Sequence, residues 1–168
     1  MKLGVSYIVF DGTELLESSI NQIRKHVDFI HVIYQETSWF GKKMPLEDIA
    51  ELKKLERAKL IDRLELFTSF APFSDTSNNS IVTAKAYERN KRQAGLNRCL
   101  AEKCTHFLCM DSDEFYTSEQ FKNAKDLIIS KNLTSTAVKL INYVNIPTCH
   151  RGIDVSATVP FICRINPT

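Results

Sequence analysis

The sequence has little of what marks several specialised classes of protein. Five glycines and five prolines in 168 residues are too few for a fibre or a low-complexity chain. No apolar run approaches the roughly twenty residues needed to cross a bilayer, and the apolar opening, residues 1–10, is too short for a signal peptide. We therefore expect a single domain over residues 1–168, without a membrane span and located in the cytoplasm.

An excess of charge of either sign is also missing. The chain carries 22 Lys and Arg against 20 Asp and Glu, a formal net charge of +2. A balance this close does not favour a nucleic-acid-binding or membrane-surface protein. Any anion must be bound by a local group of residues.

The five cysteines are odd in number and include no C-x-x-C pair, so they do not favour a disulfide framework. Cys99 and Cys104 together with His106 could be imagined as zinc ligands. Their five-residue spacing and the missing second pair argue against zinc. We interpret the cysteines as reduced thiols, mostly in the core.

Short apolar segments alternate with helical patterns along most of the chain. Strands are predicted at 3–10, 29–34, 64–70 and 106–110, with helices between them near 13–27, 45–60 and 81–103, the last carrying a stripe of Leu96, Leu100 and Cys104. A helix at 118–130, a strand at 137–144 and a loop-rich tail with Pro147, Pro160 and Pro167 follow. This alternation predicts an α/β fold with a mainly parallel central sheet and helices on both faces.

The most informative segment is FLCMDSDEFY, residues 107–116. Its apolar strand delivers Asp111, Ser112, Asp113 and Glu114 at the carboxyl end, where parallel sheets bind their ligands. Grouped carboxylates repel one another unless a cation intervenes, and Mg²⁺ or Mn²⁺ prefers oxygen ligands. An extended backbone would place Asp111 and Asp113 on the same side, facing one ion. The segment therefore predicts a divalent metal site.

Two other interpretations of this segment stay open. The first is a solvated acidic turn before the helix at 118, because D-x-D often occurs by chance. The second is phosphoryl transfer through an aspartyl nucleophile. Such enzymes usually carry D-x-D on the first strand, with Thr or Val two residues after the second Asp. Here the motif follows the fourth predicted strand, and Phe115 stands two residues after Asp113.

The helix before this strand carries Lys85, Arg89 and Arg92 at steps of four and three, hence on one face. A solvated face explains such a pattern for most residues. A cation beside a metal site would also complement a diphosphate, and we select Arg92 alone for that role.

Taken together, these segments resemble the glycosyltransferases of the GT-A fold, in particular family 2 and relatives whose acidic motif reads D-x-D-E-F. Residues 92–96, RQAGL, resemble the family's R-N-x-G-L helix segment, and residues 107–116 resemble the strand and metal motif that follow it. Residues 8–34 resemble the first strand, loop, helix and second strand. The resemblance covers about residues 1–120, which it marks as the nucleotide-sugar-binding half. Gln93 in place of Asn, and Gln35 to Ser38 in place of an Asp-rich turn, depart from the family pattern.

The resemblance implies a function and a set of residues. It implies transfer of a sugar from a nucleotide-diphosphate sugar, with UDP the favoured nucleotide, to a glycan or other hydroxyl acceptor, with Mn²⁺ or Mg²⁺ on Asp111 and Asp113. The nucleotide-sugar contacts that it implies are Phe10, Asp11, Glu36, Arg92, Asp111 and Ser112.

Residues 121–168 would form a short acceptor-side part, either truncated or minimal. An inverting transfer needs a base within hydrogen-bond reach of the acceptor hydroxyl. The late candidates are His150, as a metal ligand or the base, and Asp154, as the base. For both residues, an ordinary surface position is the competing interpretation. The short tail also leaves open a non-catalytic module that binds the sugar nucleotide or serves in assembly.

Overall fold

The computed structural model describes residues 1–68, 78–144 and 146–165, and for residues 78–80, 142–144 and 146–157 it describes the backbone only. The elements in chain order are β1 (Leu3–Val9), α1 (Thr13–Ile23), a 3₁₀ turn (Arg24–His26), β2 (Phe29–Tyr34), α2 (Leu46–Arg57), β3 (Arg63–Leu66), α3 (Asn78–Ala101), β4 (His106–Asp111), α4 (Ser118–Ser130), β5 (Ser135–Val144) and β6 (Ile146–Arg164).

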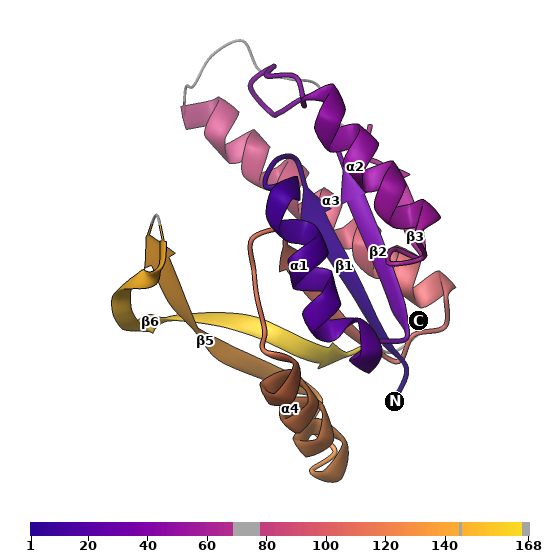
Figure 1. Ribbon diagram of the computed structural model, residues 1–168, viewed down its shortest axis with the longest axis vertical. Coiled ribbons are helices and arrows are strands. Elements are labelled where there is room, and N and C mark those ends of the chain that lie inside the picture. The colour runs from indigo at the N-terminus through magenta and orange to yellow at the C-terminus, as the bar shows by residue number, and fades with distance from the viewer. Residues whose placement is uncertain (69–77, 145, 166–168) are drawn as a thin grey trace.

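One six-stranded sheet runs through the molecule in the order β3-β2-β1-β4-β6-β5. Strands β3, β2, β1 and β4 are parallel, whereas β6 is antiparallel to both β4 and β5. Beyond the body of the molecule, the β5–β6 pair projects as a long hairpin (Figure 1). The predicted α/β class with a mainly parallel sheet is confirmed.

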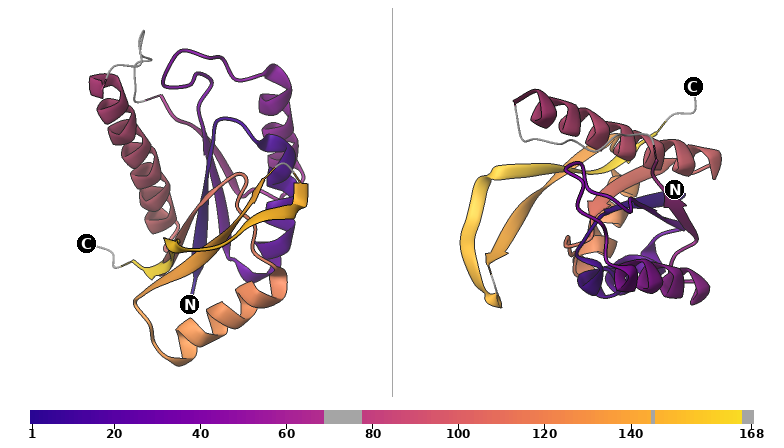
Figure 2. Two further views of the ribbon diagram at one scale, coloured as in Figure 1. Left: turned by 90° about the vertical axis from the view of Figure 1, so that its left-hand side faces the viewer. Right: turned by 90° about the horizontal axis from the view of Figure 1, so that it is seen from above.

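Helices cover both faces of the parallel strands. Every residue of β1 and β2 is buried, as expected for strands covered on both sides. On one face, Leu3, Val5 and Tyr7 share a core cluster with Leu16 and Ile20 of α1. Helix α3 lies on the opposite face, away from α1 and α2 (Figure 2). The predicted placement of helices on both faces is therefore also confirmed.

The direction of each crossover explains this arrangement. The chain steps outward from β1 to β2 and β3 through α1 and α2, and then returns past β1 to β4 through α3. Parallel crossovers are almost always right-handed, so a connection that reverses direction must place its helix on the other face of the sheet. Strands β1 and β4 are thus neighbours whose onward connections leave in opposite directions.

The buried face of α3 differs from the predicted one. Lys91, Gly95 and Cys99, at steps of four, are the buried residues, whereas Leu96 and Leu100 are only partly buried. The reason is the close packing of this helix on β1, which favours small side chains. A Cβ on Gly95 would lie 2.3 Å from the Ser6 hydroxyl oxygen.

The tail was expected to be loop-rich, and this expectation was wrong, because Ile146–Arg164 forms β6. Pro160 is tolerated there, since β6 pairs with β4 only at Cys163 and Arg164. Residue 160 has no partner in the β4 ladder, and its partner in β5, Ala137, lies beside an irregularity of that ladder. Proline is tolerated in a sheet at such positions.

The expected core positions of Cys99 and Cys104 are confirmed, as both are buried with free thiols. None of the described helices is long and apolar enough to span a bilayer.

Candidate functional site

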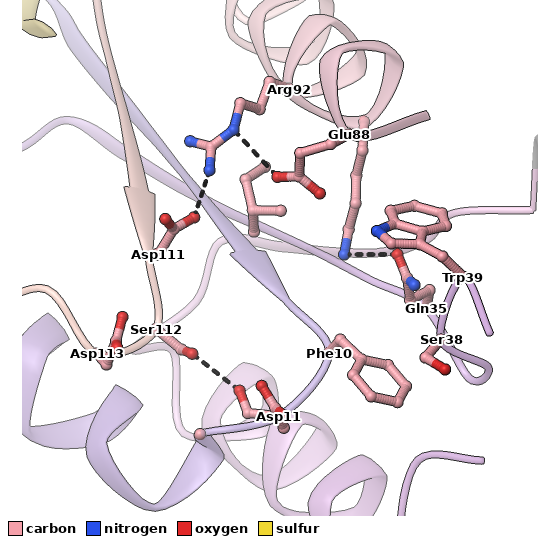
Figure 3. Close-up of a pocket in the computed structure, with 13 residues that line it drawn as sticks. Phe10, Asp11, Gln35, Ser38, Trp39, Glu88, Arg92, Asp111, Ser112 and Asp113 are labelled. Carbon is pink, nitrogen blue, oxygen red and sulfur yellow. Dashed lines mark hydrogen bonds and ion pairs between the residues drawn. The ribbon is translucent and has the colours of Figure 1, made fainter. Parts of the chain in front are cut away.

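A pocket of about 400 Å³ opens at the carboxyl ends of the parallel strands. Its lining residues come from four segments (Figure 3). Segment 8–12 spans the end of β1, 35–39 follows β2, 88–92 lies within α3, and 111–113 spans the end of β4. Four segments far apart in sequence therefore meet at one edge of the sheet. In open α/β sheets, ligands bind where neighbouring strands send their connections in opposite directions, and β1 and β4 form that point here.

The acidic segment turns sharply as it leaves β4. Asp111 is the last residue of the strand, and the Glu114 backbone N–H donates to the Asp111 carbonyl oxygen at 3.2 Å. The backbone is therefore not extended here. The prediction that Asp111 and Asp113 lie on the same side had assumed an extended backbone. Asp111 and Asp113 nevertheless both line the pocket.

Glu114, the third carboxylate of the segment, has a structural position. Its side chain accepts a hydrogen bond from the Asp111 backbone N–H at 3.3 Å, and its carbonyl oxygen accepts one from the Ser19 hydroxyl at 2.6 Å. Burial, with a smaller contribution from Asp111, raises the pKa of the Glu114 carboxyl. Two carboxylates of the cluster, and not three, are thus presented to the pocket.

The loops after β1 and β4 are fastened to each other. The buried Ser112 donates its hydroxyl to the Asp11 carbonyl oxygen at 2.8 Å. Gly12 makes this approach possible, because its φ is +70° and a Cβ would lie 2.9 Å from the Ser112 oxygen. Asp11 and Asp113 are consequently held on adjacent loops at the mouth of the same pocket.

Arg92 reaches the pocket from α3 and joins the acidic segment. Its guanidinium lies 2.7 Å from the Asp111 carboxylate and 3.0 Å from the Glu88 carboxylate (Figure 3). It also contacts the Cys109 sulfur at 3.2 Å. These contacts hold a fork of N–H donors beside Asp111. Guanidinium forks of this kind match carboxylate and phosphate oxygens.

Lys91, the residue before Arg92, is buried in the wall of the pocket. Its ammonium donates to the Val9 carbonyl oxygen at 2.8 Å and to the Gln35 side-chain oxygen at 3.0 Å, and it lies 5.9 Å from the centre of the Trp39 ring. Burial lowers the pKa of Lys91 to about 8, against the opposing influence of Glu88 and Asp111. The ends of β1 and β2 are therefore held together by one buried cation.

The structure brings most of the predicted residues together. Those that line the pocket are Phe10, Asp11, Arg92, Asp111, Ser112 and Asp113. Glu36 is exposed and is not among the lining residues, whereas its neighbour Gln35 is. His150 and Asp154 lie on β6, where His150 pairs with Tyr143, but their side chains are outside the described residues.

Sequence reasoning missed Lys91, Gln35, Trp39 and Glu88 as pocket residues. For Lys91 a signal was present, since it falls at four-residue steps from Gly95 and Cys99, the face that packs on the sheet. A lysine on a buried helical face is rare unless it is paired, and this points to a specific role.

The donor set fits a cation that shares its coordination with a ligand. Among the described residues, no group of three or more His, Cys, Asp or Glu side chains is placed to hold a metal ion. Mg²⁺ is commonly bound through one or two carboxylates, with substrate phosphates and water completing the shell. Asp111 and Asp113 meet that lower requirement.

Comparisons with known proteins identify no family. No protein-family model matches the sequence, and no curated protein matches it significantly. Among solved structures, residues 1–349 of TarS from S. aureus align with a TM-score of 0.48 and 16% identity, covering 87% of this chain and 37% of that one. This chain thus spans little more than a third of that structure, and a similarity of this size does not establish a shared activity.

Proposed function

We propose that this chain binds a nucleotide-diphosphate sugar with Mn²⁺ or Mg²⁺ and transfers the sugar to an acceptor hydroxyl, as a GT-A type glycosyltransferase. One observation carries the proposal. At the carboxyl ends of β1 and β4, whose connections leave in opposite directions, a single pocket combines the carboxylates of Asp111 and Asp113 with the guanidinium of Arg92. The sequence resemblance of the same segments to family 2 glycosyltransferases supports it independently.

In this proposal Asp113 and the second carboxylate oxygen of Asp111 would hold the divalent ion. The bound ion would supply positive charge that stabilises the departing nucleoside diphosphate. Asp111 keeps one oxygen on Arg92, which fixes the orientation of the carboxylate. Arg92 in turn stands within the pocket as a donor for a phosphate oxygen.

Phe10 and Asp11 would contact the nucleoside, with UDP as the favoured nucleotide. Ser112, whose hydroxyl is committed to Asp11, would act through the loop that it fastens. The general base for an acceptor hydroxyl, a glycan being one candidate, would come from His150 or Asp154 of β6.

The first experiment measures thermal unfolding with UDP and with Mn²⁺, alone and together. A ligand that binds only the native state stabilises it by about 2.7 kcal/mol at 100 times its Kd, which corresponds to a rise of about 5–10 °C in Tm for a domain of this size. We expect that rise with UDP and Mn²⁺ together. If none of UDP, GDP, CDP and ADP raises the Tm in the presence of metal, the proposed function is wrong.

A matched pair of variants locates the site. Asp113→Asn should abolish the metal-dependent part of the Tm shift, because a neutral amide is a poorer ligand for a hard cation. Asp126→Asn, a change at an exposed aspartate paired with Lys122 on α4, should leave the shift unchanged. Equal shifts in both variants would place the ligand elsewhere.

Turnover is measured by release of UDP from UDP-sugars with and without acceptors. We expect UDP release to require Mn²⁺ and to be lost in Asp113→Asn. Binding without any release, across a panel of acceptors, would instead support a non-catalytic nucleotide-sugar-binding module.

A further inference from the structure

A second cavity lies at the opposite end of the sheet from the pocket at Asp111. Its volume is about 420 Å³, a usual size for a small-molecule site. Thr105 and His106 line it where β4 begins, and Arg164 lines it where β6 ends. Met1, just before β1, also lines it, so the cavity lies near the point marked N in Figure 1. The two cavities have no lining residue in common.

Arg164 brings to this cavity a guanidinium without a carboxylate partner. It donates to the side-chain oxygen of Asn132, and no described Asp or Glu lies within ion-pair distance of it. The described lining also includes no Asp or Glu. A guanidinium has five N–H donors, so most of those on Arg164 remain available to a ligand.

His106 stands opposite Arg164 in the pairing of β4 with β6, so the two side chains lie on the same face of the sheet. Its Nδ1 lies 2.9 Å from the Thr105 hydroxyl, and its Nε2 has no hydrogen-bond partner among the described residues. With the hydroxyl donating to Nδ1, the ring proton lies on Nε2.

This Nε2 is available to a ligand, although His106 is only 8% exposed. Among the described residues, Nε2 of His31 alone is fully enclosed without a hydrogen-bond partner, so Nε2 of His106 retains an open surface. The cavity that His106 lines supplies that open space. A buried polar atom of this kind is normally satisfied by a ligand or by water.

The remaining wall of the cavity is largely apolar. Ile128 and Ile129 come from the last turn of α4, and Met1 and Ile165 flank the sheet strands β1 and β6. Ile129 is 52% exposed, so apolar surface stays uncovered close to an unpaired cation. A ligand that uses both features has a charged group at one end and an apolar body at the other.

The charges around the cavity favour a monoanion over a dianion. Arg164 supplies one positive charge, and burial, with a smaller contribution from Arg164, lowers the pKa of His106, so this ring is neutral at pH 7. The carboxyl end of α4 borders the cavity and carries a partial negative charge. A phosphate dianion would therefore be poorly compensated, whereas a carboxylate matches a single guanidinium fork.

We propose that this cavity binds a small monocarboxylate with an apolar body, at a site independent of the proposed function. The carboxylate pairs with Arg164, and Nε2 of His106 donates to one of its oxygens. The apolar body covers Ile129 and its neighbours. Because the charged and apolar contacts act together, neither an alcohol nor an inorganic anion satisfies both.

Titration of the full chain with hexanoate, followed by amide NMR, tests the site. We expect saturable shifts centred on residues 105–106, 128–132 and 164–165. Hexanol and hexylammonium share the apolar body but lack the carboxylate, and acetate has the carboxylate without the body. Each should bind at least about 10-fold more weakly than hexanoate.

Arg164→Gln should weaken hexanoate binding by at least about 10-fold, the value of a hydrogen bond to a charged group. Arg57→Gln, the same change at an exposed arginine of α2, should leave the Kd unchanged.

Ile129→Asp gives an independent readout if Arg164→Gln fails to fold, because the position is exposed. The new carboxylate would repel the ligand and remove part of the apolar wall, so the Kd should rise by at least about 10-fold. Leu127→Asp is its matched control, since Leu127 is equally exposed but does not line the cavity.

Several results would overturn the monocarboxylate site. They are the absence of saturable shifts with hexanoate, equal affinity for hexanoate and hexanol, tighter binding of inorganic phosphate than of hexanoate, and an unchanged Kd in Arg164→Gln and Ile129→Asp. Because Arg164 does not line the pocket at Asp111, the Tm shift with UDP and Mn²⁺ should persist in Arg164→Gln. Failure at either site therefore leaves the proposal for the other standing.

Discussion

His31 is a fully buried histidine on the α3 face of the sheet. Its Nδ1 lies 3.0 Å from the Ser6 hydroxyl, and its Nε2 has no hydrogen-bond partner among the described residues. The nearest charge is the Glu65 carboxylate, 3.6 Å from Nε2, which is already paired with Arg98 at 2.8 Å. Burial lowers the pKa of His31 to about 4, with Glu65 opposing this change and Arg98 and Arg63 adding to it.

This histidine predicts an acid-sensitive fold. The unfolded chain binds a proton at His31 near pH 6.5, whereas the folded chain resists it until about pH 4. The stability that neutral His31 contributes is therefore complete above pH 6.5 and is lost as the pH falls through 4. Tm measured between pH 8 and pH 4 should decline less steeply in His31→Asn than in wild type.

His26→Asn is the control for that measurement, because the His26 ring is only partly buried and bonds to Ser118. This variant should retain most of the wild-type slope of Tm against pH. Indistinguishable slopes for wild type and His31→Asn would contradict the prediction.

At the scale of elements, the close packing of α3 on β1 predicts that adding one methyl group at Gly95 lowers the stability of the fold. A Cβ on Gly95 would lie 2.3 Å from Ser6 Oγ and 2.8 Å from Ser6 Cβ, distances that force backbone movement. Gly95→Ala should therefore destabilise the protein by about 1–3 kcal/mol, the usual effect of overpacking, despite the higher helix propensity of alanine. Denaturant unfolding measures this change.

Two further variants identify the cause of that loss. Ser6→Gly removes both clashing atoms, and it also removes the hydrogen bond to His31, so the test is the coupling between the two sites. Gly95→Ala should cost less stability in the Ser6→Gly background than in the wild type. Asn97→Ala, an exposed position on the same helix, should change stability little. An equal cost of Gly95→Ala in both backgrounds would show that the clash is not the cause.

The same elements show how far the sequence predicts the structure. Strands β1 and β2 were predictable, because strands buried on both faces leave continuous apolar runs. Strand β4, whose residues alternate between buried and partly buried, was predictable from its short apolar run and the carboxylates that follow it. The contact between Lys91 and Gln35 was not predictable, because the two residues are 56 positions apart and meet only when α3 packs across the end of β2. Strand β6 was hidden by Pro160, whose tolerance depends on where the β4 ladder stops.

At the scale of the whole molecule, the pocket is assembled from loops that the sheet topology brings together, and its cation site is incomplete by itself. Four carboxylates line it, those of Asp11, Glu88, Asp111 and Asp113, and Glu88 and Asp111 are paired with Arg92. Among the described residues, no three His, Cys, Asp or Glu side chains are grouped to hold a metal ion. Free Mn²⁺ should therefore bind the protein weakly, and a diphosphate should complete its coordination. Metal and nucleotide are then linked ligands, and each must tighten the other by the same factor.

We expect that factor to be about 5- to 150-fold, the usual range of such coupling. Titration of Mn²⁺ followed by electron paramagnetic resonance, with and without UDP, gives one side of the cycle, and calorimetry of UDP with and without Mn²⁺ gives the other. Asp113→Asn should bring both factors toward unity, whereas Asp126→Asn should not. Tight Mn²⁺ binding in the absence of nucleotide would contradict the prediction, because it would require a ligand set larger than the Asp111 and Asp113 carboxylates.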